Sequence, residues 1–502
     1  MYMDRMRYKP LLGKVMLADE AAAFIRDGMT VGISGFTSAG EPKVVPLALA
    51  RRAQREQFKI NLMSGASLGH DIDGALAEAG ALARRLPFQS DARMRQAINR
   101  GDIMFVDQHL SETVEMLRAH VMGKIDIAVI EAVAITEDGG IVPSTSVGNS
   151  ASFAILAEHV IVELNLSQSP TWEGLHDIYI PTRRPYRESI PLTQVRQRIG
   201  LPYIPIEPSK ILAIVITEEP DSPSPILPPD QDTASIAGHL AEFFAYEVRS
   251  GRLPANLLPL QAGIGTVANA TLQGLVNSPY EHLTMYSEVL QDSAFALMET
   301  GKLDFASCSA VTLSPQMQRH VLKNLNHFKD QFVLRPQEIS NHPELIRRLG
   351  VIAINTALEA DIYGNVNSTH VLGTKMMNGI GGSGDFARNA AVAIFVTKSL
   401  AKDGQISSIV PMITHVDHTE HDVDVLVTEV GLADLRGLAP RERAISIIEN
   451  CVHPHYRSLL QDYYQEALAL GGHTPHVLEK AFGWHLHYLK HGTMQRDPLK
   501  VP

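Results

Sequence analysis

The amino-acid sequence predicts an α/β protein composed of two similar units, each an open sheet with helices on both faces. Three observations lead to this expectation. Runs of β-branched residues alternate with amphipathic helical stretches, which is typical of sheets covered by helices. The same set of motifs occurs in both halves of the 502-residue chain, and one proline-rich segment separates the halves.

The alternation of strand and helix patterns is clear at several places. The run KILAIVI at residues 210–216 is apolar and β-branched, so it predicts a buried strand. The stretches KVVPLALARRA (43–53) and SAFALMETG (293–301) carry apolar residues at helical spacing and predict amphipathic helices. A further helix is predicted over IAGHLAEFFAYEV, residues 236–248. Such an alternation indicates open α/β sheets.

Three motifs indicate that one structural unit occurs twice in the chain. In the first half they are VGISGFTSAG, GDIMFVD and IDIAVIEAVAITEDGGI, at residues 31–40, 101–107 and 125–141. In the second half their counterparts are LPLQAGIGTVAN, GKLDFAS and VIAINTALEADIYGNV, at residues 258–269, 301–307 and 351–366. The two sets of motifs match weakly at individual residues, but the order of the motifs along the chain and the spacing between them match well. Generic α/β patterning remains an alternative explanation of the likeness.

A domain boundary is predicted where proline and polar residues concentrate, in TEEPDSPSPILPPDQDTAS at residues 217–235. This segment separates a predicted strand from a predicted helix. We therefore expect an N-terminal domain over residues 1–216, a linker over 217–235 and a C-terminal domain over 236–502.

Composition limits the class of protein. A hydrophobic content of 45% and a charged content of 20% are those of an ordinary globular chain with a large core. No apolar run has membrane-spanning length, and the N-terminus lacks the features of a secretory signal. The two cysteines, Cys308 and Cys451, cannot form a disulfide framework, which predicts a reducing, cytoplasmic location. The net charge of −11 argues against a nucleic-acid or membrane surface.

The segment GIGGSG, residues 379–384, has the G-x-G-x-x-G spacing of dinucleotide-binding loops. That fingerprint needs a strand before the glycines, a helix after them and an acid about 20 residues on, at a strand end. Here THVLGTKMMN makes a poor strand, and Asp403 lies in a loop-like segment. A dinucleotide site and a plain glycine turn remain alternatives. We favour a loop that offers backbone N–H groups to a ligand, as an oxyanion hole does.

A second glycine turn, QAGIGTVANA at residues 261–270, follows an apolar strand and enters a helical pattern. It offers N–H groups at the carboxyl edge of a sheet, where open α/β proteins bind ligands. Shortly after it, Glu288 stands where an apolar strand gives way to a helix. A lone glutamate is usually a solvated or capping residue, but Tyr286, Val289 and Leu290 flank this one and predict partial desolvation of its carboxylate.

The histidine-rich stretch HVDHTEH places His415, His418 and His421 three residues apart. On a helix this spacing would suit zinc and a metallohydrolase. The segment leads into the strand pattern DVLVT, however, and positions three apart in a strand face opposite sides. We therefore expect a hydrogen-bonded histidine network and no metal, with metal binding as the alternative.

Six motifs resemble the acetyl-CoA hydrolase/transferase family, which includes succinyl-CoA:acetate and propionyl-CoA:succinate CoA-transferases. They are SGFTSAGEPK, AGIGTVANA, MYSEVLQDS, RPQEISNHPELIRRLG, NSTHVLGTKMMNGIGGSGDFARN and PMITHVDHTEHDVDVLVTEVGLADLRGL. The resemblance covers nearly the whole chain, from about Val31 to Arg457. The resemblance implies two α/β CoA-transferase domains with the active site between them. It also implies transfer of CoA between short acids such as acetate, propionate and succinate, with acyl-CoA hydrolysis as the alternative.

The resemblance further implies a catalytic role for Glu288, which would attack the acyl-CoA carbonyl and then carry CoA as a glutamyl thioester. The N–H groups of Ile264 and Gly382 would form the oxyanion hole. The residues implied in CoA binding are Gly263, Ile264, Gly265, Thr266, Val267, Gly382, Phe386 and Lys402. Asn341 and Glu429 would position the substrate carboxylate or support Glu288. The acyl pocket would be shaped by Gly35, Phe36, Thr37 and Gly40.

The remaining implications concern ligands and assembly. CoA is expected as a substrate and covalent intermediate, with no permanently bound cofactor. Acyl-CoA and short-chain carboxylates are the expected partners, and the family's usual homodimer is the expected assembly. Ser38 departs from the pattern, because the family motif SGFTPAG has proline at this position, and the change is expected to alter only the acyl-side loop.

Overall fold

The computed structural model describes residues 2–33, 35–224 and 229–495, and these form two compact units. Unit 1 contains the described residues up to 224 together with 282–349 and 378–385. Unit 2 contains residues 229–281, 350–377 and 386–495. Both combine parallel strands with helices, so the predicted α/β class is confirmed.

Unit 1 contains a seven-stranded sheet whose order is β4-β3-β2-β1-β5-β8-β9. Its neighbouring strands are parallel, as expected when helices connect them. The strands are β1 (Thr30–Ile33), β2 (Ile60–Ser64), β3 (Leu82–Leu86), β4 (Met104–Phe105), β5 (Ile127–Ala132), β8 (His159–Asn165) and β9 (Ile211–Thr217). The short strands β6 (Ala134–Ile135) and β7 (Ile141–Val142) form a separate hairpin.

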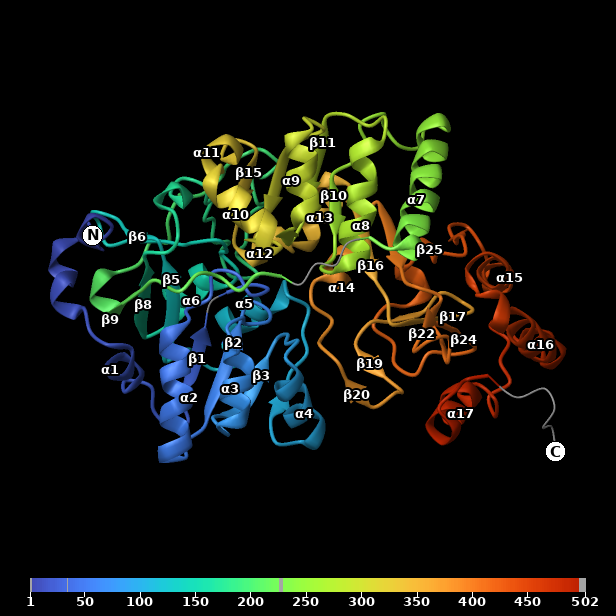
Figure 1. Cartoon of the computed structure of the whole chain (residues 1–502), viewed down its shortest axis with the longest axis horizontal. Coiled ribbons are helices and arrows are strands. Elements are labelled where there is room, and N and C mark those ends of the chain that lie inside the picture. The colour runs from blue at the N-terminus through green and yellow to red at the C-terminus, as the bar shows by residue number, and fades with distance from the viewer. Residues whose placement is uncertain (1, 34, 225–228, 496–502) are drawn as a thin grey trace. The chain divides into compact units, whose positions relative to one another are not determined.

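Helices cover both faces of this sheet. They are α1 (Ala18–Ala22), α2 (Val44–Glu56), α3 (Ile72–Glu78), α4 (Ala92–Arg100), α5 (Glu112–Arg118) and α6 (Ser150–Leu156). Val31 and Ile33 of β1 are buried in one core with apolar residues of α1 to α4, and Figure 1 shows α2 and α3 side by side along the strands. Gly32 alternates to the other face, where a Cβ would lie 2.9 Å from the ring of Phe153 in α6.

A second set of elements in unit 1 begins at residue 282. The parallel strands β15 (Phe332–Leu334), β13 (Leu303–Cys308) and β11 (Leu283–Tyr286) are neighbours in that order. The short strands β12 (Val289–Leu290) and β14 (Ala310–Val311) pair beyond the ends of β11 and β13. The helices are α9 (Asp292–Glu299), α10 (Pro315–Lys323), α11 (Leu325–Phe328), α12 (Gln337–Ser340), α13 (Pro343–Leu349) and the start of α14 (Ser383–Ala387).

Unit 2 has the strand order β10-β16-β21-β25-β26. These strands are β10 (Leu260–Ala262), β16 (Ile352–Thr356), β21 (Val392–Val396), β25 (Val425–Val427) and β26 (Leu432–Asp434), of which only β26 is antiparallel to its neighbour. Smaller strands are β17 (Glu359–Asp361), β18 (Val366–Asn367), β19 (His370–Val371), β20 (Lys375–Met376), β22 (Leu400–Ala401), β23 (Ile406–Ser407) and β24 (Ile409–Val410). The helices are α7 (Gln231–Arg249), α8 (Thr266–Gly274), α15 (Pro440–Cys451), α16 (Pro454–Leu470) and α17 (Gly483–His491).

Strand order supports the predicted internal repeat. The order β1-β5-β8-β9 in unit 1 has the same chain progression as β10-β16-β21-β25 in unit 2, and β2-β3-β4 corresponds to β11-β13-β15. One pairing of motifs from the sequence is therefore wrong: GDIMFVD contains β4, whose counterpart is β15, whereas GKLDFAS contains β13, the counterpart of β3. Both motifs have the same glycine-then-strand pattern, which explains the mismatch.

The compact units differ from the predicted domains of residues 1–216 and 236–502, because residues 282–349 pack within unit 1. The predicted linker, 217–235, also includes residues 225–228, which lie outside the described part of the chain. Its first part is not a free connection. Asp221 is buried, and its carboxylate accepts hydrogen bonds from the Gly40 N–H, at 3.2 Å, and the Thr145 hydroxyl.

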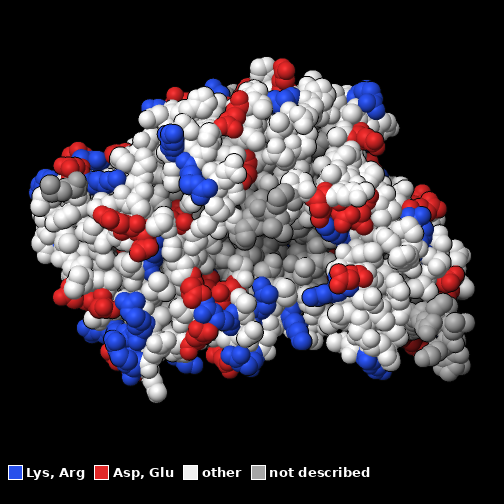
Figure 2. Space-filling model, viewed as in Figure 1, with Lys and Arg blue, Asp and Glu red and all other residues white. Residues whose placement is uncertain are grey.

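Surface charge is mixed on the face seen in Figure 2, where Lys and Arg side chains alternate with Asp and Glu. No extended basic area covers that face. Among the helices in the described ranges, none is both long and apolar enough to cross a membrane.

Candidate active site

Glu288 occupies the short connection between β11 and β12 in unit 1. Its main-chain carbonyl accepts hydrogen bonds from the N–H groups of Ser309 (2.7 Å) and Ala310 (3.1 Å), so the connection is fixed to the end of β13. Only 6% of Glu288 is exposed. The partial desolvation predicted from its apolar sequence neighbours is therefore confirmed and exceeded.

Asn341 contacts the Glu288 carboxylate directly. Its Nδ2 donates a hydrogen bond to Glu288 Oε1 at 2.6 Å. The buried hydroxyl of Tyr286 donates to the carbonyl of Ile339, which ties the end of β11 to α12 beside this contact. Burial raises the pKa of Glu288 to about 7, and the hydrogen bond from Asn341 opposes the shift. The site therefore holds a carboxylate that ionises near neutral pH.

The glycine-rich loop, residues 378–385, packs against the first half of unit 1. The N–H of Ile380 donates to Asp107 Oδ1 at 2.8 Å, and the N–H of Leu110 donates to the carbonyl of Gly381 at 3.3 Å. At the end of the loop, Asp385 accepts hydrogen bonds from the N–H and hydroxyl of Ser111. Contacts from both ends thus hold the loop in place.

Gly382 lies directly against the hydrogen bond between Glu288 and Asn341. A Cβ at position 382 would lie 1.7 Å from Glu288 Oε1 and 2.3 Å from Asn341 Nδ2. The N–H of Gly382 donates no hydrogen bond to another described residue. The backbone at Gly382 therefore packs directly against the Glu288 carboxylate and the Asn341 amide, the place where an oxyanion-hole donor would be needed.

The loop does not have the context of a dinucleotide fingerprint. The two-residue strand β20 and a turn precede Gly379, and the following helix, α14, spans five residues. A Rossmann motif instead runs from a buried strand straight into the first glycine and on into a long helix. The expectation of a backbone donor loop fits this geometry better.

The acyl-side loop from the first half also lies in unit 1. Phe36 belongs to one buried apolar cluster with Val289, the residue after Glu288. Gly35 has φ +121°, and a Cβ there would lie 2.5 Å from Glu41 Cβ. Gly40 has φ +62°, and a Cβ there would lie 2.5 Å from Ser146 Oγ. Both glycines are thus required by conformation and by close packing.

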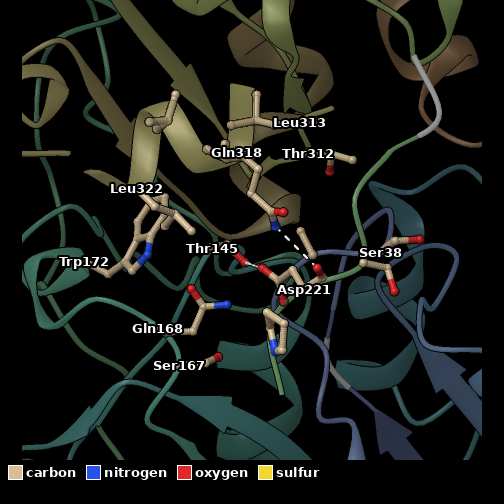
Figure 3. A pocket seen from close by; sticks show the side chains of 15 residues that line it. Ser38, Thr145, Ser167, Gln168, Trp172, Asp221, Thr312, Leu313, Gln318 and Leu322 are labelled. Atoms are coloured by element: carbon tan, nitrogen blue, oxygen red, sulfur yellow. Dashed lines mark hydrogen bonds between the residues drawn. The ribbon is translucent and has the colours of Figure 1, made fainter. Parts of the chain in front are cut away.

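Thr37 and Ser38 have φ values of +58° and +62°, a conformation uncommon for residues with a side chain. Proline, whose ring fixes φ near −65°, does not fit at position 38 in this loop, and the Ser38 N–H donates to the carbonyl of Ser67 at 3.2 Å. Ser38 also lines a cavity of about 30 Å³, shown in Figure 3 with Thr145 and Gln318 hydrogen-bonded to Asp221. The presence of serine in place of the expected proline at position 38 is therefore linked to the backbone conformation of this loop.

Several predicted CoA-binding residues belong to unit 2. Gly263, Ile264 and Gly265 connect β10 to α8, and Thr266 and Val267 form its first turn. Gly265 has φ +118° and precedes the helix, whose N-terminal N–H groups favour negative charge. Ile264 is 38% exposed. The predicted turn from a strand into a helix is confirmed.

The other unit 2 residues differ in their surroundings. Phe386 is fully buried in α14. Lys402 lies exposed at the turn between β22 and β23, with φ +51°. The carboxylate of Glu429 accepts hydrogen bonds from the N–H and hydroxyl of Ser399, the former at 2.8 Å. The CoA and substrate roles of these residues remain predictions.

The three histidines do not share one environment. The ring of His415 packs against His370, with 3.7 Å between centroids, and its Nε2 lies 3.3 Å from Asp417 Oδ1. His418 is buried against Phe395, whereas His421 is 83% exposed. The histidine segment itself folds as a loop and a short 3-10 helix, and the strand predicted in DVLVT after it is present as β25. Within residues 2–33, 35–224 and 229–495, no group of three His, Cys, Asp or Glu residues could hold a metal ion.

Comparison with known proteins adds independent information. The model described as "Acetyl-CoA hydrolase/transferase N-terminal domain" matches residues 1–216, and the corresponding C-terminal domain model matches residues 318–464. The chain belongs to the acetyl-CoA hydrolase/transferase family. It is an enzyme of the CoA-transferase type, with acyl-CoA hydrolysis as the alternative activity. The resemblance seen in the sequence is thereby confirmed.

Individual relatives of this chain carry two kinds of name. A succinyl-CoA:acetate CoA-transferase from Clostridium kluyveri is 53% identical over 98% of this chain and 92% of its own length. An acetyl-CoA hydrolase from Candida glabrata is 46% identical over 98% of this chain and 97% of its own length. The crystal structure of RipA from Yersinia pestis has the same fold, with a TM-score of 0.72 and 24% identity over 91% of this chain and 98% of RipA.

Two residues of the site carried no recognisable signal in the sequence. Asp385 and Ser111 are 274 positions apart, and both are buried within hydrogen-bond distance of each other next to Asn341. The segment SGDFARN did contain Asp385, but an aspartate at the start of a helix is usually a capping residue. Only the folded chain shows its proximity to Glu288.

Proposed function

We propose that this protein is an acyl-CoA:carboxylate CoA-transferase that uses Glu288 as its nucleophile and moves CoA between short-chain acids such as acetate, propionate and succinate. One observation carries the proposal: a buried carboxylate, held by the Asn341 amide, lies against the backbone of Gly382. A carboxylate that ionises near neutral pH in a desolvated site is a competent nucleophile.

The reaction balances without a proton donor. A Glu288 oxygen attacks the thioester carbonyl carbon, the C–S bond breaks, and CoA leaves as the thiolate from a mixed anhydride. The thiolate then attacks the glutamyl carbonyl carbon and expels the donor acid as its carboxylate. The resulting glutamyl-CoA thioester is converted back by the acceptor carboxylate through the same steps in reverse. Such a sequence gives ping-pong kinetics.

The backbone loops supply what this chemistry needs. Each tetrahedral intermediate develops an oxyanion, and a fixed N–H donor typically contributes about 3–4 kcal/mol to its stabilisation. We assign this role to the N–H groups of Gly382 and Ile264. Asn341 holds one Glu288 oxygen, which leaves the other oxygen for attack. Lys402 would bind CoA phosphates as a point charge.

Further parts of the proposal follow from the family. CoA acts as a substrate and covalent intermediate, and no permanently bound cofactor takes part. The active enzyme is a homodimer in the cytoplasm. The buried apolar cluster that Phe36 forms with Val289, next to Glu288, supports an acyl pocket bounded by apolar side chains.

Acyl-CoA hydrolysis is the second candidate, because relatives at similar identity are named for either activity. The burial of Glu288 favours transfer, since an anhydride or thioester on this side chain is protected when water is excluded.

We therefore expect acyl-CoA consumption to depend on an acceptor acid. With acetyl-CoA and succinate, or succinyl-CoA and acetate, transfer should exceed the acceptor-free loss of thioester by at least about 100-fold, because the buried site excludes water. Free thiol and acyl-CoA products, measured in parallel with and without acceptor, give both rates. Equal thioester loss in the absence of any acceptor acid would identify the protein as a hydrolase.

A further inference from the structure

Two buried carboxyl groups share one amide nitrogen at this site. Asn341 Nδ2 lies 2.6 Å from Glu288 Oε1 and 3.4 Å from Asp385 Oδ2. An amide nitrogen carries two hydrogens, so it can serve both carboxyl groups at once. Both carboxyl groups are buried, with 6% of Glu288 and 3% of Asp385 exposed. Whether Asp385 is ionised or neutral therefore affects both the orientation of the Asn341 amide and the charge next to Glu288.

Ser111 fixes Asp385 from the opposite side. The Ser111 N–H lies 3.0 Å from Asp385 Oδ2, and the Ser111 hydroxyl oxygen lies 2.6 Å from Oδ1. Ser111 immediately precedes α5, and Arg118 at the end of α5 pairs with Glu338 of α12 at 2.5 Å. Asn341 directly follows α12 as its C-cap residue. Asp385 thus joins the glycine loop to the two helices that frame the nucleophile.

We propose that Asp385 is a positioning residue that works as a neutral acid: it orients the Asn341 amide toward Glu288 and holds Gly382 beside it. This inference rests on the proposed role of Glu288. In the neutral form, the 2.6 Å contact with the Ser111 hydroxyl reverses its direction, so that the protonated Oδ1 donates to the Ser111 oxygen, while Oδ2 still accepts from the Ser111 N–H and the Asn341 amide. These polar contacts are then satisfied without a second negative charge in the site.

The surroundings of Asp385 favour the neutral form. Burial, and to a smaller extent the negative charge of Glu288, raise the pKa of Asp385 to about 8, against the hydrogen bonds from Ser111 and Asn341. The two interacting carboxyl groups titrate as a pair.

Other ionisable groups face the loop from neighbouring elements. A Cβ on Gly384 would meet the ring of His109, and Asp107 accepts a hydrogen bond from the Ile380 N–H. In α5, Arg118 forms ion pairs with the carboxylates of two glutamates, Glu115 at 3.0 Å and Glu338 at 2.5 Å. The positive charge of Arg118 is therefore balanced by carboxylates other than Asp385.

A neutral Asp385 has a consequence for the second half-reaction. The acceptor acid reaches the glutamyl-CoA thioester as a carboxylate, so an ionised Asp385 would repel it in a buried site of low dielectric. The value of kcat/KM for the acceptor should therefore fall as pH rises through the pKa of Asp385, which burial still raises in the thioester form although Glu288 is then uncharged. The value of kcat/KM for acyl-CoA should fall as pH drops through about 7, where Glu288 becomes protonated.

Two substitutions separate these effects. Asp385→Asn mimics the neutral acid in shape and hydrogen bonding, so it should keep the activity at pH 7 within about tenfold and abolish the alkaline fall in kcat/KM for the acceptor. Asp385→Ala removes the contacts to Ser111 and Asn341, and should lower kcat about 100-fold, as expected for misplaced reacting groups. Asp361→Asn is a matched control, because Asp361 is another buried carboxyl bonded to an asparagine amide, in unit 2.

The experiment can distinguish an error in the role of Asp385 from an error in the proposed role of Glu288. Full-length wild type, both Asp385 variants and the control are first compared by thermal unfolding and by hydroxylamine trapping of CoA on Glu288. If wild type forms no Glu288 adduct, the role of Glu288 fails. If wild type forms it, the inference is overturned by either of two results. One is an Asp385→Asn variant as inactive as the Asp385→Ala variant at equal stability, and the other is an alkaline fall that persists after Asp385→Asn.

Discussion

Replacing Glu288 by Gln should reduce CoA transfer to background while acyl-CoA still binds. The glutamine side chain has the same shape and still accepts the hydrogen bond from Asn341 Nδ2, but its amide cannot form the anhydride. Steady-state transfer rates and equilibrium binding of acyl-CoA measure the two effects separately. Loss of about four or more orders of magnitude in kcat is expected for removal of a covalent nucleophile.

Glu288→Asp tests position, because the carboxylate is retained but retracts by one methylene from Asn341 and Gly382. Misplacement of about 1 Å can lower a rate about 100-fold. Glu299→Gln provides the control, since Glu299 is a partly exposed glutamate on α9, paired with His320. We expect this control to keep full activity. Substantial transfer activity in the Glu288→Gln variant would remove Glu288 from the mechanism.

Gly382→Ala should lower kcat by at least about 100-fold, because the added methyl group would lie 1.7 Å from Glu288 Oε1 and either the carboxylate or the loop has to move. Movement of the carboxylate breaks its contact with Asn341, and movement of the loop displaces the N–H assigned to the oxyanion hole. Rates of the first half-reaction, measured with acyl-CoA alone, show the defect directly.

The matched control is Gly238→Ala, because Gly238 lies within α7 and a Cβ there meets no atom within 4 Å. That substitution should leave transfer unchanged and slightly stabilise the helix. Thermal unfolding of both variants separates loss of activity from loss of fold. A wild-type kcat in the Gly382→Ala variant would show that the close approach of this backbone has no catalytic role.

The sequence predicted the repeated α/β architecture because its elements are specified locally. Runs such as those around Val31 and Ile352 are apolar and β-branched, and they became β1 and β16, which both have neighbouring strands on either side. Glycines with special geometry, such as Gly35 and Gly265, were recognisable because other residues rarely adopt positive φ. Glu288 was recognisable by its apolar neighbours together with the family motif.

Contacts between distant segments could not be predicted in the same way. The pairing of Ser111 with Asp385 and the packing of residues 282–349 with the first half of the chain depend on tertiary structure. Asp221 looked like part of a polar linker, but its burial and its contacts with Gly40 and Thr145 follow from folding alone. The positive φ of Ser38 likewise has no signal in residue type.

The most direct test of this account is to detect CoA on Glu288. The protein is incubated with acetyl-CoA or succinyl-CoA in the absence of an acceptor acid, treated with hydroxylamine or borohydride, and digested for peptide mass spectrometry. We predict a hydroxamate or an alcohol on the peptide that contains Glu288, formed in one equivalent per active site and absent after Glu288→Gln. Modification of another residue, such as Cys308 or Cys451, or no modification during active turnover, would contradict the glutamyl-CoA mechanism.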